Sequence, residues 1–149
     1  GRLLRVKQHL DEDEVFCFTY GDGLTDLDIT SVINFHKKHG KAATVTTSQP
    51  PGRFGSLEIR NGIVTSFKEK PPGYGTLINA GYFVLNKEVL NYIKNDNTSW
   101  EKEPLEKLAN IGELMAFEHK GFWKPMDTLS DKNSLESMWV NKKAPWRVW

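Results

Sequence analysis

One aspartate, Asp22, stands where the chain could hold a divalent cation, and a second, Asp127, lies at an element boundary. Asp22 lies in Gly21-Asp22-Gly23, directly after the apolar run 15–20, and Asp127 follows Pro125-Met126. The apolar run is typical of a strand covered on both faces in a parallel sheet, and ligands gather at the carboxyl ends of such strands. Carboxylates there could bind a metal ion that is itself bound to phosphate. Local sequence alone favours plainer roles, a turn at Asp22 and a helix N-cap or a turn at Asp127.

A second group of residues could contact a sugar phosphate. Lys70, in Glu69-Lys70-Pro71, could place one ammonium group against a phosphate, and Glu69 could accept sugar hydroxyls. An exposed ion pair is the plainer interpretation of these two residues. Gly55 and Gly81 would each allow close approach of a ligand to the backbone, and a bulge is the alternative at Gly55.

Other site chemistries find little support in the sequence. The four histidines have no zinc-type spacing with one another or with Cys17. Cys17 lies inside an apolar run and is expected in the core rather than as a nucleophile. Asp26 and Asp28 are expected to be turn and cap residues. The glycine patterns of phosphate-binding loops and of serine hydrolases do not occur.

Composition limits the partners that the chain is expected to have. Lys and Arg total 20 and Asp and Glu total 19, a net charge of +1, which argues against a nucleic-acid-binding protein. No apolar run approaches the roughly 20 residues of a membrane-spanning helix, so no membrane partner is expected. The single cysteine excludes an internal disulfide, and the lack of a signal peptide predicts a cytoplasmic protein.

A strand–helix–strand unit is expected to place Asp22 at the end of its first strand. After the run 15–20, Asp28 is a suitable N-cap for a helix that ends at Gly40, and residues 42–47 are rich in β-branched side chains. Such a βαβ unit has a right-handed crossover. The predicted fold class is therefore α/β.

The rest of the chain continues in the same class. Asn61-Gly62 between two strand-like runs indicates a hairpin, because both residues tolerate positive φ. The expected elements are strands 56–60 and 63–67 around this turn, a strand 77–85, a short helix 87–93 capped by Asn86, a helix 104–110, a strand 114–119 and a last helix from about 131 to 142. Without a linker or repeat, residues 1–149 are predicted to form one α/β domain.

Taken in order, several segments resemble the sugar-phosphate nucleotidyltransferases, and within them the cytidylyltransferase branch. No single motif is decisive, but five in order are specific, and the similarity covers essentially the whole chain. The motifs are Tyr20-Gly21-Asp22-Gly23, Pro51-Gly52-Arg53-Phe54-Gly55, Phe67-Lys68-Glu69-Lys70-Pro71, Ile78-Asn79-Ala80-Gly81-Tyr82-Phe83-Val84-Leu85 and Pro125-Met126-Asp127-Thr128; residues 100–104, 112–119 and 144–146 also match.

The resemblance implies a Rossmann-like nucleotidyltransferase sheet with a β-hairpin excursion, and a role for each candidate residue. Asp22 and Asp127 match the two aspartates that bind Mg²⁺, and Lys70 matches the lysine that contacts the sugar phosphate. These three are the implied catalytic residues. Glu69 matches the acid that accepts sugar hydroxyls, and the other implied substrate contacts are Gly23, Gly55, Asn79 and Gly81.

The implied reaction transfers a cytidylyl group from CTP to α-D-glucose 1-phosphate. The products are CDP-glucose, for nucleotide-sugar and O-antigen synthesis, and pyrophosphate. Two carboxylates would hold the Mg²⁺ that neutralises the triphosphate, and Lys70 would screen the attacking phosphate.

The resemblance is to the C-terminal portion of the family. Family members begin with a glycine-rich G-G-x-G-T-R loop and a nearby lysine that hold the nucleotide phosphates, and neither occurs in this chain. The sheet is therefore expected to be incomplete at its N-terminal side, and CTP to bind only if the missing half is supplied. The chain would be inactive alone.

The alternative is a non-catalytic module that binds sugar phosphate or forms oligomers. A homo-oligomer is expected to form through the aromatic residues Trp139, Trp146 and Trp149, or through an exposed sheet edge beside residues 15–20.

Overall fold

Short strands alternate with helices along most of the chain. The computed structural model describes residues 1–10, 14–49, 56–68 and 77–148, with the backbone alone described at 56–58 and 67–68. In chain order the elements are α1 (Arg2–Arg5), the 3-10 helix η1 (Lys7–Leu10), β1 (Val15–Thr19), β2 (Gly23–Thr25), α2 (Ile29–His39), β3 (Ala43–Ser48), β4 (Ser56–Arg60), β5 (Ile63–Lys68), β6 (Ile78–Asn86), the 3-10 helix η2 (Lys87–Tyr92), α3 (Glu103–Asn110), β7 (Leu114–His119), β8 (Trp123–Pro125) and α4 (Leu129–Val140). The predicted α/β class is confirmed.

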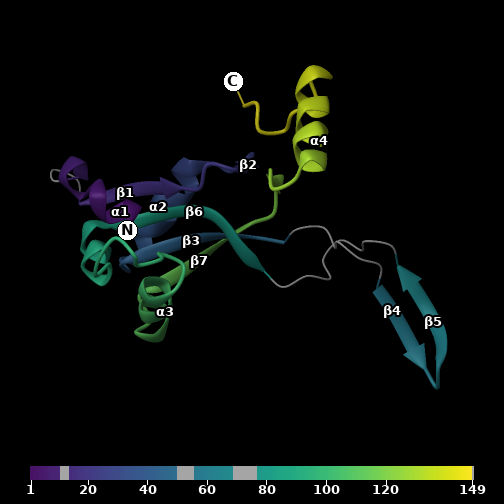
Figure 1. The fold of residues 1–149 in the computed structure, drawn as a ribbon, viewed down its shortest axis with the longest axis horizontal. Coiled ribbons are helices and arrows are strands. Elements are labelled where there is room, and N and C mark those ends of the chain that lie inside the picture. Colours follow the sequence, from purple (N-terminus) through teal and green to yellow (C-terminus); the bar gives the residue numbers. More distant parts are fainter. Residues whose placement is uncertain (11–13, 50–55, 69–76, 149) are drawn as a thin grey trace.

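The central sheet has the strand order β1-β6-β3-β7 (Figure 1). β6 is antiparallel to β1 and β3, whereas β3 and β7 are parallel. β1, β3 and β7 therefore run in one direction and end at the same edge of the sheet, where β6 begins. The expectation that β1 has parallel neighbours is wrong, because β6 lies between β1 and β3.

β1 also differs from its prediction in burial. It pairs with β6 alone among the described strands, and its residues alternate in exposure, with Phe16 buried and Cys17 exposed. The prediction that Cys17 belongs to the core is therefore wrong, because β1 lies at the side of the sheet. The strand covered on both faces is β3, which is buried at every position from Ala43 to Ser48.

Alternate residues of β3 reach two different layers, as the strand period of two requires. Ala43 and Val45 belong to the hydrophobic core, which also contains Leu85 of β6, Leu90 of η2 and Leu108 of α3. Thr44 lies on the other face, within hydrogen-bond distance of His36 in α2 (2.9 Å between Oγ1 and Nδ1). The sheet therefore lies between α2 on one face and η2 and α3 on the other.

Helix α2 and the hairpin begin and end as their sequences predict. The Asp28 side chain accepts a hydrogen bond from the Thr30 N–H, and Gly40 closes the helix in the left-handed region with φ 66°. At the hairpin turn between β4 and β5, Asn61 has φ 49° and Gly62 has φ 80°.

Two predicted caps are wrong. The N-cap of α4 is Thr128, which forms a capping box with Asp131, so Asp127 is not the cap and the helix begins at Leu129. Asn86 precedes η2 without a side-chain cap bond, and its Oδ1 lies 2.8 Å from Nε2 of His36 instead.

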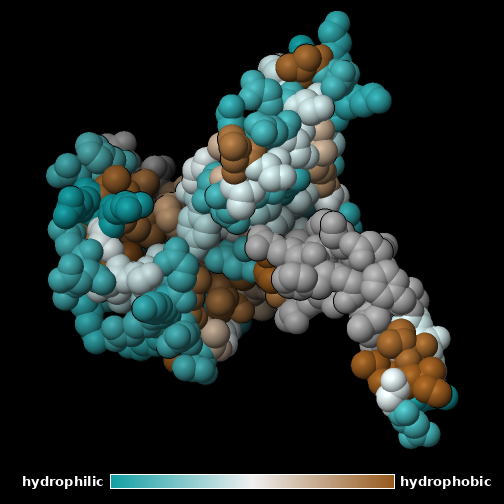
Figure 2. Space-filling view, turned by 45° about the vertical axis from the view of Figure 1, so that its right-hand side comes forward, coloured by the Kyte–Doolittle hydropathy of each residue, from teal (hydrophilic) through white to brown (hydrophobic). Residues whose placement is uncertain are grey.

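The β4–β5 hairpin stands apart from the central sheet (Figure 1). Exposed apolar residues of the hairpin include Ile59, Ile63 and Val64, and the hairpin carries an apolar surface in Figure 2. None of the helices among the described residues is long and apolar enough to cross a membrane.

Candidate functional site

The two predicted metal ligands lie at one end of a short antiparallel ribbon. Its strands, β2 and β8, pair Gly23 with Pro125, and beyond them the Met126 N–H donates to the Asp22 carbonyl (2.8 Å). We call residues 22–26 and 122–126 the ribbon. Because Asp22 is bonded to Met126 across it, Asp127 is only one residue further along. Segments about one hundred residues apart in sequence thus bring the two aspartates together.

The ribbon leaves the sheet at the edge where β1, β3 and β7 end. Asp22 follows β1, and β8 follows β7, while Asn79 and Gly81 lie at the start of the oppositely directed β6. Asp22, Asp127 and Asn79 are exposed at this edge. The carboxyl edge of an open α/β sheet is where ligands bind, so the predicted position of Asp22 is confirmed in this respect.

The backbone conformation at position 81 explains why this residue is a glycine. Its φ is +80°, and a Cβ there would lie 2.6 Å from Cδ2 of Tyr20. The strand is irregular at this point, because the Asn79 Oδ1 accepts the Gly81 N–H (2.8 Å) and the pairing with β3 shifts between Val45 and Thr47. The glycine therefore allows a kink that places Asn79 beside Tyr20, whose hydroxyl lies 3.2 Å from the Asn79 Nδ2.

Two aromatic side chains connect the ribbon to β6 in opposite directions. The Tyr82 hydroxyl of β6 donates to the Gly23 carbonyl of the ribbon (2.6 Å), and Nε1–H of the ribbon's Trp123 donates to the Ala80 carbonyl of β6 (2.8 Å). Burial raises the pKa of Tyr82 and, more strongly, the pKa of Tyr20, and the nearby Asp22 carboxylate adds to both shifts. Asp22 therefore lies close to both phenols.

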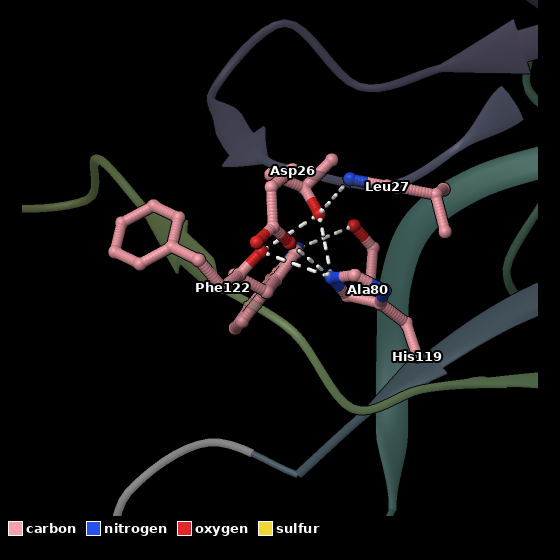
Figure 3. Close-up of polar contacts among 7 residues, drawn as sticks. Asp26, Leu27, Ala80, His119 and Phe122 are labelled. Atoms are coloured by element: carbon pink, nitrogen blue, oxygen red, sulfur yellow. Dashed lines mark hydrogen bonds and ion pairs between the residues drawn. The ribbon is translucent and has the colours of Figure 1, made fainter. Parts of the chain in front are cut away.

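The other end of the ribbon meets the end of β7. Nε2 of His119 lies 3.0 Å from the Asp26 carboxylate and 3.1 Å from both the Thr25 hydroxyl and the Phe122 carbonyl (Figure 3). Asp26 is therefore an ion-pair partner rather than only a turn residue. Thr25 and Asp26 approach the same ring nitrogen, so the group cannot relay a proton as a hydrolase triad does.

A cavity of 710 Å³ adjoins Asp22 on the side away from the ribbon's Asp26 end. Tyr20, Gly21 and Asp22 form one wall, and Ser99, Trp100 and Glu101 form part of the other. The candidate metal ligand therefore faces a space large enough for a phosphorylated small molecule.

The oxygen donors at this end of the ribbon suit a hard divalent cation such as Mg²⁺. Among the described residues no group of three or more His, Cys, Asp or Glu is arranged to hold a metal ion. Mg²⁺ commonly binds one or two carboxylates and completes its shell with phosphate oxygens and water. Asp22 lines the open cavity, and Asp127 lies near it in backbone position, which fits that pattern and does not match a structural zinc site.

Three of the predicted site residues, Gly55, Glu69 and Lys70, lie outside the described residues. Of the others, Gly23 lies in β2 and Gly81 is buried in β6. The sequence reasoning missed Tyr82, Trp123 and His119 as contacts of this region. Tyr82 lies in the segment 78–85 that resembles the family, directly after Gly81, and this position is the signal that could have identified it.

The model of a protein family, nucleotidyl transferase, matches residues 3–131. This chain belongs to the nucleotidyl transferase family. The chain is 61% identical over 149 residues to a glucose-1-phosphate cytidylyltransferase of Salmonella typhimurium, covering 100% of this chain and 58% of the relative. A mannose-1-phosphate guanylyltransferase catalytic subunit beta of Dictyostelium discoideum is 33% identical and covers 93% of this chain and 39% of the relative.

A solved structure supports the same placement. HddC from Yersinia pseudotuberculosis superposes with a TM-score of 0.63 at 25% identity, over 90% of this chain and 60% of HddC. The predicted Rossmann-like nucleotidyltransferase fold is confirmed, with a central sheet that is mostly antiparallel. This nucleotidyl transferase chain spans 58% of the length of its Salmonella typhimurium relative.

Proposed function

We propose that this chain supplies the metal-binding and sugar-phosphate-binding part of an enzyme that makes CDP-glucose and pyrophosphate from CTP and α-D-glucose 1-phosphate. The observation that carries the proposal is the ribbon, which brings Asp22 and Asp127 to one end, beside the 710 Å³ cavity. The 61% identity to a glucose-1-phosphate cytidylyltransferase supports the choice of sugar and nucleotide.

In this reaction an oxygen of the sugar phosphate attacks the α-phosphorus of CTP. A new P–O bond forms, the bond from the α-phosphorus to its bridging oxygen breaks, and pyrophosphate leaves with the electron pair. Mg²⁺, when bound, would neutralise part of the triphosphate charge. The chain needs to position the reactants and screen their charges, which are the main contributions to such a transfer.

Each candidate residue has one task in this proposal. Asp22 and Asp127 bind the cation, Lys70 screens the charge of the sugar phosphate, and Glu69 accepts the sugar hydroxyls. Asn79 contributes its amide, the substrate passes close to the backbone at Gly23 and Gly55, and the buried Gly81 permits the kink that presents Asn79.

The nucleotide needs a further protein segment in this proposal. HddC has also been solved in complex with GMP-PN, which supports a nucleotide site in proteins of this fold. The glycine-rich loop expected to hold the nucleotide phosphates does not occur in this sequence. We therefore propose that CTP binds when a segment corresponding to the rest of the Salmonella relative is present.

A chimera tests the proposal. The chain replaces the matching 149 residues of the Salmonella typhimurium relative, and CDP-glucose is measured with CTP, glucose 1-phosphate and Mg²⁺. Asp22→Asn and Asp127→Asn should each lower turnover by about 100-fold or more, because each removes a cation ligand. Lys70→Ala should abolish binding of glucose 1-phosphate in calorimetry. The matched control is Asp28→Asn, since asparagine also caps helices well.

The result that would contradict the proposal is a folded chimera that makes no CDP-glucose. Turnover by Asp22→Asn equal to that of the Asp28→Asn control would contradict the metal role specifically.

A second candidate function, an oligomerisation module, is favoured by the surface of α4 and the tail. Leu129 is 71% exposed, Val140 71% and Val148 78%, and apolar atoms are visible on α4 in Figure 2. Such side chains are commonly covered when subunits associate. Sedimentation velocity of the chain should reveal oligomers that Val140→Ser weakens, and a wild-type monomer at every concentration would exclude this function.

A further inference from the structure

The ribbon that carries the two aspartates has little support of its own. β2 and β8 have three residues each, and a two-stranded ribbon of this size is not stable in water without packing against other elements. Both aspartates lie beyond the last paired residues, Gly23 and Pro125. Their positions therefore depend on what holds the ribbon against the sheet.

The bond of Tyr82 acts at the end that carries the aspartates, whereas Trp123, which pairs with Thr25, reaches Ala80 from the other end of the ribbon. Tyr82 holds the carbonyl of Gly23, the residue that follows Asp22, and Trp123 holds Ala80, the residue that follows Asn79. One bond runs from β6 to the ribbon and the other returns from the ribbon to β6. Together they determine where Asp22, a candidate ligand of the metal ion, lies relative to Asn79, a candidate contact of the sugar.

Contacts at the far end do not replace this pair. The His119 and Asp26 side chains meet at the end of the ribbon away from Asp22, where the Asp26 N–H is bonded to the Phe122 carbonyl (3.2 Å). They hold the ribbon to β7. Rotation of the Asp22 end about that point is opposed by the Tyr82 bond, which joins β6 to Gly23 beside Asp22, while the Trp123 bond joins β6 to the ribbon next to the pivot.

We propose that Tyr82 and Trp123 are positioning residues, which hold the metal-binding end of the ribbon in place without touching metal or substrate. The inference rests on the proposed function, because it takes Asp22 and Asp127 as cation ligands. Neither residue acts on the reacting atoms. Their role is to keep the aspartates preorganised, so that binding does not first have to order the ribbon.

The test removes one polar group at a time from the full chain. Tyr82→Phe loses only the hydroxyl that donates to Gly23, and Trp123→Phe loses the indole N–H. Tyr92→Phe is the matched control, because it deletes the same atom from a ring that packs against Lys107, away from the ribbon. Binding of Mn²⁺ is measured by electron paramagnetic resonance, and exchange of the Met126 amide by NMR, under conditions where every variant is folded.

We expect Tyr82→Phe and Trp123→Phe each to weaken Mn²⁺ binding about fivefold to tenfold, as the loss of one buried hydrogen bond would. The Met126 amide, which is bonded to Asp22, should exchange faster by a similar factor. Tyr92→Phe should change neither measurement. Exchange of a core amide such as that of Leu85 reports global unfolding, so a residue that only contributes to global stability would speed exchange at Leu85 and Met126 alike, whereas a positioning residue speeds it at Met126 alone.

Two separate results would overturn two separate claims. If the Met126 amide exchanges at the wild-type rate in both variants, the positioning role is wrong, whether or not the metal binds. If the wild-type chain binds no Mn²⁺, or binds it equally well after Asp22→Asn, the proposed metal site is wrong. Should Tyr82→Phe fail to fold, Trp123→Phe tests the same connection from the ribbon side.

Discussion

The two ends of the central sheet each contain a histidine network, and the two networks are built differently. At the end where β3 and β7 begin, His39, Thr44, His36 and Asn86 form a continuous chain of hydrogen bonds, with Thr44 0% and His36 2% exposed. At the end where β7 finishes, His119 meets Asp26, Thr25 and Phe122 around a single ring nitrogen.

Each hydrogen bond of the first network has one possible direction. The Lys41 N–H donates to Nδ1 of His39 (2.9 Å), so Nε2 carries the proton and donates to the Thr44 hydroxyl (2.7 Å). The Thr44 hydroxyl then donates to Nδ1 of His36 (2.9 Å), whose Nε2–H donates to Asn86 Oδ1 (2.8 Å). The chemistry of the partners determines these tautomers. Every group in this series of hydrogen bonds has a partner.

The second network is less complete. One Nε2–H has both the Phe122 carbonyl and the Asp26 carboxylate as acceptors, and the buried Asp26 Oδ1 makes no hydrogen bond although it lies 3.0 Å from the ring nitrogen. The 3.0 Å contact between them is therefore an electrostatic one. The network of His36, His39, Thr44 and Asn86 thus pairs its ring nitrogens and stabilises the core, whereas the network at the far end of the ribbon from Asp22 leaves the Asp26 Oδ1 without a hydrogen bond.

The largest difference between the two ends should come from their left-handed glycines. Gly81→Ala should cost about 2–5 kcal/mol of unfolding free energy, because the left-handed backbone is strained and the new Cβ collides with Tyr20. Gly40→Ala, at the end of the sheet where β3 begins, should cost about 1–2 kcal/mol of unfolding free energy, because a Cβ there meets nothing within 4 Å. Urea unfolding of both variants measures the difference, and equal costs would show that Tyr20 moves aside freely.

Two threonine substitutions should separate the two networks by a smaller margin. Thr44→Val removes the central link of the first network and leaves one ring nitrogen of His36 and one of His39 without a partner, at a cost of about 2–4 kcal/mol. Thr25→Val removes a partly buried hydroxyl whose acceptor, the Phe122 carbonyl, still has His119, at a cost of about 1 kcal/mol. Chemical denaturation gives both values, and a larger cost for Thr25→Val would reverse the comparison.

The sequence predicted the features whose cause is local. The Asp28 cap and Gly40 end of α2, and the Asn61-Gly62 turn, depend on residues within a few positions of one another, and all three were found. Asp22 was placed at the correct edge because strands of an α/β protein end there. The α4 cap was missed by one residue, since Asp127 and Thr128 are both good caps and only Thr128 meets Asp131.

What the sequence did not predict depends on pairing between distant segments. β6 inserts between β1 and β3, and an apolar run does not tell an edge strand from a central one, so Cys17 was expected to be buried. β2 and β8 are too short for a period of two to be recognised. Without the ribbon, neither Tyr82 nor Trp123 could be connected with the candidate site.

As the pH falls, the network of His36, His39, Thr44 and Asn86 should lose stability before the carboxylates become protonated. Burial, followed by the neighbouring His36 imidazole, lowers the pKa of His39 below its usual 6.5, so the folded state binds this proton less readily than the unfolded state does. Stability should therefore be fully present above pH 6.5 and fall as the pH drops through that value. Glu113 and Asp131 have lowered pKa values as well, so their contributions are lost at lower pH, below about 4.5.

Denaturation curves at several pH values between 8 and 5 measure the effect of His39. His39→Gln should flatten the slope of unfolding free energy between pH 7 and 5.5, because glutamine does not titrate. An unchanged slope in that variant would show that another group is responsible.

The smallest expected effects come from one lysine at each end. Lys41 lies 3.1 Å from Glu113 with 41% and 33% of the two side chains exposed, whereas the ribbon's Lys124 lies 3.6 Å from Asp131 with 28% and 25% exposed. Lys41→Gln should cost less than about 1 kcal/mol and lose most of that cost in 1 M salt, because exposed ion pairs are screened. The cost of Lys124→Gln should fall less in 1 M salt than that of Lys41→Gln. Lys124 also donates a hydrogen bond to the Ser134 hydroxyl (3.1 Å) and is less exposed than Lys41. Unfolding free energies at low and high salt decide the matter, and equal salt dependence would mean that the ribbon end is as open to ions as the surface around Lys41.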